Sequence, residues 1–324
     1  MKLSARESAI ISSIFLDADK SVAEICRETR YHPTTVRRIL HRLYARGILR
    51  RAPLLDVYAL GFTHYGVFFS ITARKKNQHA ALIEYLVNSE QISFLVELGG
   101  DVQFGISICA RTIDEVYGFL AVMSKKFGDI FFEKSVAIRT QLIHFTLKYL
   151  STLERRPSTL RWGIGAKRVE IDDLDHRVLR ELSEHAPSTV AELARSLKIP
   201  YMTAEHRLRR LREKGVVLSN IALFDESRFG ILSYYLLVYT RGLSLEFKQQ
   251  FLAFCEQHPH IYFVVENLGS WDYEIGAQLT NLRQVTDITR PIYDQFGDQI
   301  VEIKVLPVFA YHKVRNYPFL KRPE

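Results

Sequence analysis

The chain has 324 residues, of which 47% are hydrophobic and 12% aromatic, enough to bury the cores of more than one globular domain. Lys and Arg outnumber Asp and Glu by 44 to 36, and the formal net charge of +8 permits a polyanionic partner without requiring one. Three cysteines without CxxC spacing argue against a disulfide framework or a zinc site, and no apolar run approaches the roughly 18 residues that span a bilayer. We therefore expect a cytoplasmic protein with no signal peptide, membrane partner, metal or cofactor.

One stretch of the chain occurs twice. Residues 21–50 return as residues 189–218, aligned without a gap. A period this long predicts a duplicated pair of domains and argues against a solenoid of short repeats. The identical pairs are Val22/Val190, Ala23/Ala191, Glu24/Glu192, Arg27/Arg195, Thr35/Thr203, Leu40/Leu208, Arg42/Arg210, Leu43/Leu211 and Gly47/Gly215.

Three short helices are expected at the start of the chain. Ser4 and Ser21 are capping residues for the first two, which extend to about Leu16 and Thr29. A third helix begins at Pro33, after a tight turn. Because a tight turn joins the second helix to the third, the pattern predicts a helix-turn-helix, whose third helix enters the major groove of DNA.

The third helix is expected to bury Val36, Leu40 and Leu43 and to turn a basic face outward. Side chains on such a face can donate to phosphates and guanine edges. A solvated basic face without a partner is the alternative, but the turn and the second copy favour DNA. The candidate DNA-binding residues are Thr34, Thr35, Arg37, Arg38, His41 and Arg42 in the first copy and Thr203, Glu205, His206, Arg209 and Arg210 in the second.

The two third helices differ on their outward faces. Arg37 and Arg38 are matched by Glu205 and His206. A carboxylate is repelled by phosphate but can accept a hydrogen bond from cytosine N4. Because operator symmetry mirrors protein symmetry, a target read by both helices is expected to consist of two unlike half-sites. The first copy is also the more basic, which predicts that it contributes more of the affinity.

After each helical unit the pattern becomes strand-like. From Thr63 the expected order is β-α-β-β-α-β, and it returns from Leu232 after a basic linker that contains Pro157. This order is that of a ferredoxin-like domain. The predicted fold class is therefore α+β, with two copies of a winged helix-turn-helix followed by a ferredoxin-like domain. The expected bounds are 1–54 and 169–223 for the winged helix-turn-helix units, 62–150 and 230–324 for the ferredoxin-like domains, and 151–168 for the linker.

This organisation resembles the Lrp/AsnC (feast/famine) family of transcriptional regulators. The resemblance covers nearly the whole chain, twice. It implies a DNA-binding regulator without enzyme activity, which dimerises through its ferredoxin-like (RAM-type) domains and binds a small effector, commonly an amino acid, at a Gly-x-x-Asp loop. The segments that carry it are IDDLDHRVLREL at 171–182, TAEHRLRRLREKGVV at 203–217, GILSYYLLV at 230–238 and LGSWDYEI at 268–275.

Both halves contain a candidate effector loop. In the first half Val102 stands where the second half has Asp272, so an ammonium group would lose its carboxylate partner unless Asp101 replaces it. A tight turn between strands also explains Gly99 and Gly269 without any ligand. The candidate effector-binding residues are Gly99, Gly100 and Asp101 in the first half and Gly269, Ser270, Trp271 and Asp272 in the second.

Two other functions remain open. Fused pairs of such units also occur among siroheme decarboxylases, which act on the acetate side chains of a tetrapyrrole. His144 and His312 lie at equivalent places and are candidates for acid-base work, although local hydrogen bonds of strand-end histidines explain them too. The segment LRRAPLLD at 49–56 lacks the RRFGA-like run of those enzymes, and we assign no catalytic residue. The third interpretation is an architectural DNA-coating protein without an effector.

Overall fold

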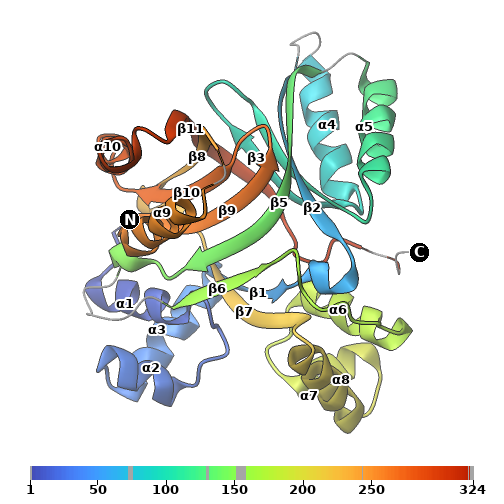
Figure 1. Ribbon diagram of the computed structural model, residues 1–324. Helices are drawn as coiled ribbons and strands as arrows, with labels where there is room; N and C mark the ends of the chain where they lie inside the picture. The colour runs from blue at the N-terminus through green and yellow to red at the C-terminus, as the bar shows by residue number, and fades with distance from the viewer. Residues whose placement is uncertain are drawn as a thin grey trace.

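The computed structural model describes residues 2–71, 76–128, 131–150, 158–242, 244–319 and 321. The first part of the expected linker, 151–157, lies outside these residues. In the remaining chain the same order of helices and strands occurs in both halves (Figure 1). The α+β fold class expected from the sequence is confirmed.

The first half begins with three helices. Ser4 and Ser21 cap α1 and α2 as expected, each in a reciprocal capping box with the glutamate three residues later. The third helix buries Ile39 together with Val36 and Leu43, whereas Leu40 is half-buried. The expected burial of Leu40 is therefore wrong. Ile39 and Leu40 are adjacent apolar residues, so helical spacing alone did not show which of the two faces the core. The elements are α1 (Ala5–Ile14), α2 (Val22–Thr29), α3 (Pro33–Ala45), β1 (Leu49–Leu55), η1 (Val57–Leu60), β2 (Thr63–Ile71), α4 (Lys76–Asn88), β3 (Ile92–Leu98), β4 (Phe104–Ala110), α5 (Ile113–Phe127), β5 (Phe131–Phe145) and η2 (Lys148–Leu150).

The second half repeats this order after one additional strand. The elements are β6 (Thr159–Gly163), α6 (Asp173–His185), α7 (Val190–Leu197), α8 (Tyr201–Glu213), β7 (Val217–Phe224), η3 (Glu226–Phe229), β8 (Leu232–Thr240), α9 (Leu245–Gln257), β9 (Ile261–Gly269), β10 (Tyr273–Leu279), α10 (Gln284–Phe296) and β11 (Ile300–Val314).

The two ferredoxin-like domains share one closed sheet. Its order is β2-β4-β3-β11-β8-β10-β9-β5, and β5 pairs back to β2, while β6 extends the sheet from β5. The long strands β5 and β11 join the halves, because each pairs with its own half along one part and with the other half along the rest. Helices α4 and α5 lie on one side of the molecule and α9 and α10 on the other (Figure 1).

The inside of the closed sheet forms an apolar core between the halves. Phe68 from the first half lies with its ring 4.9 Å from that of Trp271, which comes from the second. Arg139 and Glu274 form a buried two-bond ion pair beside them, at 2.9 and 3.2 Å. Since a buried charge without its partner is costly, this ion pair helps fix how the halves fit together.

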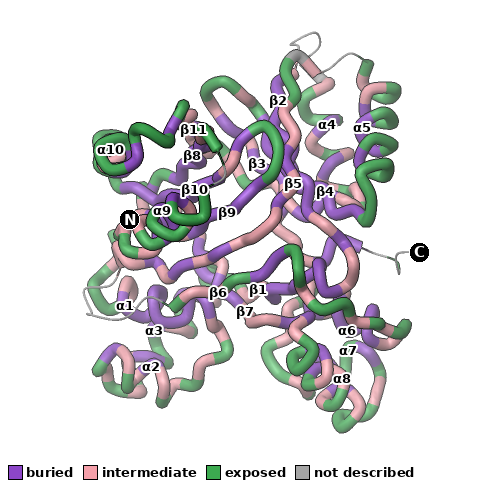
Figure 2. The backbone as a smooth tube through the Cα atoms, in the orientation of Figure 1, coloured by how far each residue is buried: buried purple, intermediate pink, exposed green. Residues whose placement is uncertain are grey.

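Both helical units attach to one two-stranded ribbon. Strands β1 and β7 pair antiparallel, from Leu49 opposite Phe224 to Leu55 opposite Val217. The first helical unit packs on Phe224 of β7, the strand that follows the second unit in the sequence. The second unit packs on Leu55 of β1, the strand that follows the first unit. As a result, α1–α3 and α6–α8 lie at the same end of the molecule, on either side of the ribbon (Figure 1). Figure 2 shows that exposed residues cover the outer faces of these helices.

Candidate functional site

The candidate DNA-binding residues of the first copy share the outward face of α3. Thr34, Arg37, Arg38, His41 and Arg42 are exposed, and Thr35 is half-buried. The opposite face of α3 packs into the core of the helical unit, which holds the helix in place. This arrangement offers a rigid basic surface at one end of the molecule, as a helix entering a DNA groove requires.

One arginine in each copy also ties the third helix to the first. Arg42 donates to Glu7 at 2.8 Å, and its counterpart Arg210 donates to Asp175 at 2.9 Å. The acidic residue lies in the first turn of α1 or α6 in each case. Sequence reasoning missed this role, although the acidic residue recurs in both copies and is the signal for it. A guanidinium has five N–H donors, so these ion pairs leave donors for phosphate.

The outward face of α8 differs from that of α3. His206 and Arg209 are exposed, while Thr203 and Glu205 are half-buried. Arg209 lies 3.8 Å from Glu213 on the same helix. The outward face of α8 therefore presents less unopposed positive charge than that of α3.

A further arginine of α8 turns toward α6. Arg207 donates to Asp172 and, at 3.1 Å, to Asp175. The hydrogen bond to Asp172 raises the pKa of Arg207 above its usual value. This pair of carboxylates thus holds Arg207 and Arg210 against the body of the helical unit.

The two candidate effector loops lie where one half meets the long strand of the other. The Gly99 N–H donates to the Pro307 carbonyl at 2.8 Å, and a Cβ at Gly99 would lie 2.5 Å from the Phe309 ring. A Cβ at Gly269, whose φ is +151°, would lie 2.6 Å from the Val136 carbonyl oxygen. Close contact between the halves therefore requires Gly269, with or without a ligand, because a Cβ there would meet backbone atoms, whereas a Cβ at Gly99 would meet the exposed side chain of Phe309.

The polar groups of these loops have partners within the protein. The Asp272 carboxylate accepts from the Thr240 N–H at 2.7 Å and from the Thr240 hydroxyl at 2.9 Å. Ser270 donates to the Val136 carbonyl, and Asp101 lies 3.3 Å from the Lys304 ammonium. Gly100 has a φ of +95° and lies over Leu306.

Trp271 does not line an open site. It is 1% exposed, and its indole N–H donates to Glu274 at 3.2 Å in the core between the halves. The Trp271 side chain therefore faces the core between the halves, and its part in an effector site stays a prediction. A tryptophan next to a turn glycine can either line a ligand site or pack in a core, and the sequence alone does not distinguish these two positions.

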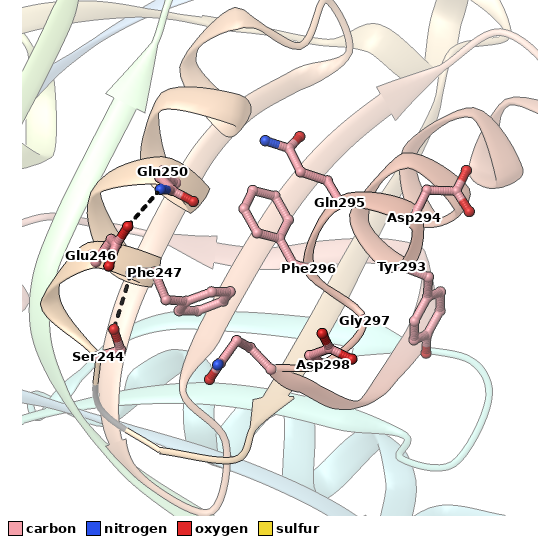
Figure 3. Close-up of a pocket in the computed structure, with 11 residues that line it drawn as sticks. Ser244, Glu246, Phe247, Gln250, Tyr293, Asp294, Gln295, Phe296, Gly297 and Asp298 are labelled. Carbon is pink, nitrogen blue, oxygen red and sulfur yellow. Dashed lines mark hydrogen bonds between the residues drawn. The ribbon is translucent and has the colours of Figure 1, made fainter.

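A separate pocket of about 340 Å³ lies between the start of α9 and the end of α10 (Figure 3). Glu246, Asp294 and Asp298 give it a negative lining, and Phe247 and Phe296 form its apolar wall. None of the candidate effector-binding residues lines it. Carboxylates in the lining make this pocket unsuited to a polycarboxylate ligand.

The two candidate histidines lie in different surroundings. The His144 ring packs against Trp162 and Phe263, its Nδ1 has no hydrogen-bond partner among the described residues, and burial lowers its pKa to about 4. His312 instead lies 2.8 Å from the Glu97 carboxylate. Their similar places in the two halves therefore do not give them a shared chemical role.

Metal-ligand groups and membrane spans were sought in the described part of the chain. No group of three or more His, Cys, Asp or Glu side chains there could hold a metal ion. Within the same ranges, every helix is too short or too polar to span a bilayer.

The chain is similar to known DNA-binding proteins. A family model described as winged helix-turn-helix DNA-binding matches residues 171–217, which span α6, α7, α8 and the start of β7. The DNA-binding transcriptional activator DecR of Escherichia coli (strain K12) is 23% identical over 132 residues, 40% of this chain and 82% of the relative. The HTH-type transcriptional regulator Zrp of Zymomonas mobilis is 28% identical over 123 residues, 38% of this chain and 80% of the relative. These comparisons confirm the resemblance to DNA-binding transcriptional regulators with a winged helix-turn-helix.

A solved structure shares the fold of the whole chain. It is the siroheme decarboxylase NirDL, with a TM-score of 0.63 over 97% of this chain and 94% of that one. The sequence identity is 11%, so the likeness shows the fold alone.

Proposed function

We propose that this chain is a sequence-specific, DNA-binding transcriptional regulator whose two helix-turn-helix units read two unlike half-sites. The observation that carries the proposal is the pair of helical units fixed to the β1–β7 ribbon at one end of the molecule, with different outward side chains on α3 and α8. The matched winged helix-turn-helix model and the regulator relatives support it.

The ribbon makes the proposal more specific. In a dimer of identical chains, two copies of one recognition helix read a palindrome. Here both helices belong to one chain and differ in sequence, so one chain presents the equivalent of an asymmetric dimer. The DNA-binding residues proposed are those on the outward faces of α3 and α8.

Selection of bound fragments from genomic DNA tests this function. The purified chain is expected to enrich a consensus whose two halves differ. Enrichment without any consensus would favour the architectural, DNA-coating interpretation.

We also propose that a small effector such as an amino acid acts at the loops around Gly100 and Ser270. These loops touch the long strand of the opposite half, so a ligand bound there would alter how the halves fit. Since Asp272 already accepts two hydrogen bonds, an ammonium group would have to share it with Thr240. An amino-acid screen by thermal shift, with Asp272→Asn in parallel, is expected to show a response that the variant loses. A response that the variant retains would remove Asp272 from the effector site.

A tetrapyrrole decarboxylase is the second candidate, because of the fold shared with NirDL over 97% of the chain. Its substrate would need cationic side chains for its carboxylates. The acidic pocket beside α10 and the neutral His144 do not supply them. Anaerobic incubation with siroheme tests it: the regulator proposal expects neither binding nor loss of carboxylate mass.

A further inference from the structure

The first turn of α8 exposes two neighbouring apolar side chains. Met202 is 70% exposed and Tyr201 49%. They follow the turn between α7 and α8, inside the segment that the winged helix-turn-helix model matches. In helix-turn-helix proteins the N-terminal residues of the recognition helix contact base edges. These two side chains therefore occupy the part of α8 that meets the bases.

Three arginines of α8 do not compete for this position. Arg207 and Arg210 turn back to carboxylates of α6, and Arg209 lies next to Glu213 one turn later. Lys198, at the end of α7, is exposed beside the turn and can meet a phosphate. The exposed apolar side chains at the start of α8 can thus contact base edges in a DNA groove, while Lys198 beside them can contact the phosphate backbone.

The first copy has different chemistry at the same place. Pro33 and Thr34 stand in the aligned positions, and Arg37 and Arg38 are exposed one turn later. Arginine pairs with O6 and N7 of guanine, whereas an apolar side chain discriminates bases by contact with the C5-methyl group of thymine. The two recognition helices therefore differ in the kind of base contact they can make, in addition to their charge.

We propose that Met202 and Tyr201 make α8 a reader of thymine methyl groups, while α3 reads guanine through Arg37 and Arg38. This inference rests on the proposed function and deepens it by assigning a base preference to each half-site. The half-site under α8 is rich in A·T pairs, and the half-site under α3 contains guanine.

Replacement of thymine by deoxyuridine tests the assignment, since it removes only the C5-methyl group. In a site selected by the full-length chain, each thymine is replaced in turn and the Kd is measured for the wild type, Met202→Ala and Leu245→Ala. Leu245→Ala is the matched control, because Leu245 is also an exposed apolar side chain in the first turn of a helix, α9, away from the helical units. Circular dichroism verifies that each variant folds.

The wild type is expected to lose about three- to five-fold in affinity at one or more thymines of one half-site, from the burial of a methyl group. Met202→Ala should abolish that loss, and Leu245→Ala should leave it intact. Equal losses for the wild type and Met202→Ala would overturn the inference. The inference would also be overturned if Met202→Ala left the Kd for DNA unchanged but altered the oligomeric state. That result would assign Met202 and Tyr201 to a protein–protein contact. An absence of DNA binding by the wild type would instead refute the proposed function itself.

Discussion

At the scale of single residues, the outward face of α3 is where the sequence was most informative. Buried Val36 and Leu43 fix the orientation of the helix, so periodicity alone located the exposed arginines. The ion pairs of Arg42 and Arg210 could not be located in this way, because their partners lie in a different helix. Likewise, the burial of Trp271 depends on contacts with the other half of the chain.

Removal of the two exposed arginines of α3 should weaken DNA binding. The double substitution of Arg37 and Arg38 by Ala is expected to reduce affinity and to lower the slope of log K against log salt by about one to two phosphate equivalents. Fluorescence anisotropy at several salt concentrations measures both. Arg290→Ala is the control, since it removes an exposed charge from α10, away from the helical units. An unaltered slope in the double variant would rule out phosphate contacts by this face.

Asp56 makes stability depend on pH. Burial raises the pKa of its carboxyl to about 6, although it accepts a hydrogen bond from the Tyr58 N–H. The pKa of Asp56 is higher in the folded state than in the unfolded state, so at pH values between these two pKa values the folded state binds more protons. The ionised carboxyl therefore destabilises the fold at neutral pH, and this destabilisation decreases on acidification toward pH 4.

We therefore expect Asp56→Asn to raise the free energy of unfolding by about 1–3 kcal/mol at pH 8 and by little at pH 4. Urea unfolding at the two pH values measures the difference. Asp225, the half-buried aspartate at the equivalent place before η3, supplies the control Asp225→Asn, which should show no such pH-dependent gain, because its carboxylate accepts from the Ser227 hydroxyl and the Arg228 guanidinium. A gain for Asp56→Asn that is the same at both pH values would argue against a carboxyl titration.

At the scale of elements, the sequence predicted the helices and the order of the other strands, but it missed β6, which lies in the expected linker, and it did not predict the long-range pairings. Capping residues and periodicity are local signals, and Ser21 with its capping box is one example. The pairing of β1 with β7, the return of β5 to β2 and the docking of the segment after β11 join residues far apart in the chain. A local pattern holds no information about such partners.

The segment after β11 holds the second helical unit in place. Tyr317 is 1% exposed, and its hydroxyl lies 2.8 Å from His176 in α6. Phe319 packs on Phe62, with ring centroids 4.6 Å apart. This segment thereby joins α6 to the first half of the chain.

Truncation of Tyr317 should loosen the second helical unit more than the first. Tyr317→Ala is expected to cost about 3–5 kcal/mol, as for other buried aromatic side chains, and to speed hydrogen exchange in α6–α8. Phe309→Ala is the matched control, because Phe309 is an aromatic residue of β11 that is 69% exposed. Equal acceleration in α1–α3 and α6–α8 would contradict a local role.

At the scale of the whole molecule, one chain contains two paired ferredoxin-like domains, whereas the family resemblance implies that such domains pair between the two subunits of a dimer. The closed sheet joins the ferredoxin-like domains, and the ribbon joins the helical units. Homo-oligomer formation through the ferredoxin-like domains stays a prediction, which sedimentation of the purified chain can test. The asymmetry of the two recognition helices is the property that distinguishes this chain from a dimer of identical subunits.

Exchange of half-sites in the DNA measures the asymmetry of the two recognition helices directly. From a selected site, three DNAs are made: the natural site and the two palindromes that duplicate either half. We predict that the natural site binds one chain at least about tenfold more tightly than either palindrome, since each mismatched base pair costs about 1–3 kcal/mol. Equal affinity for all three DNAs would contradict the claim that one chain reads two unlike half-sites.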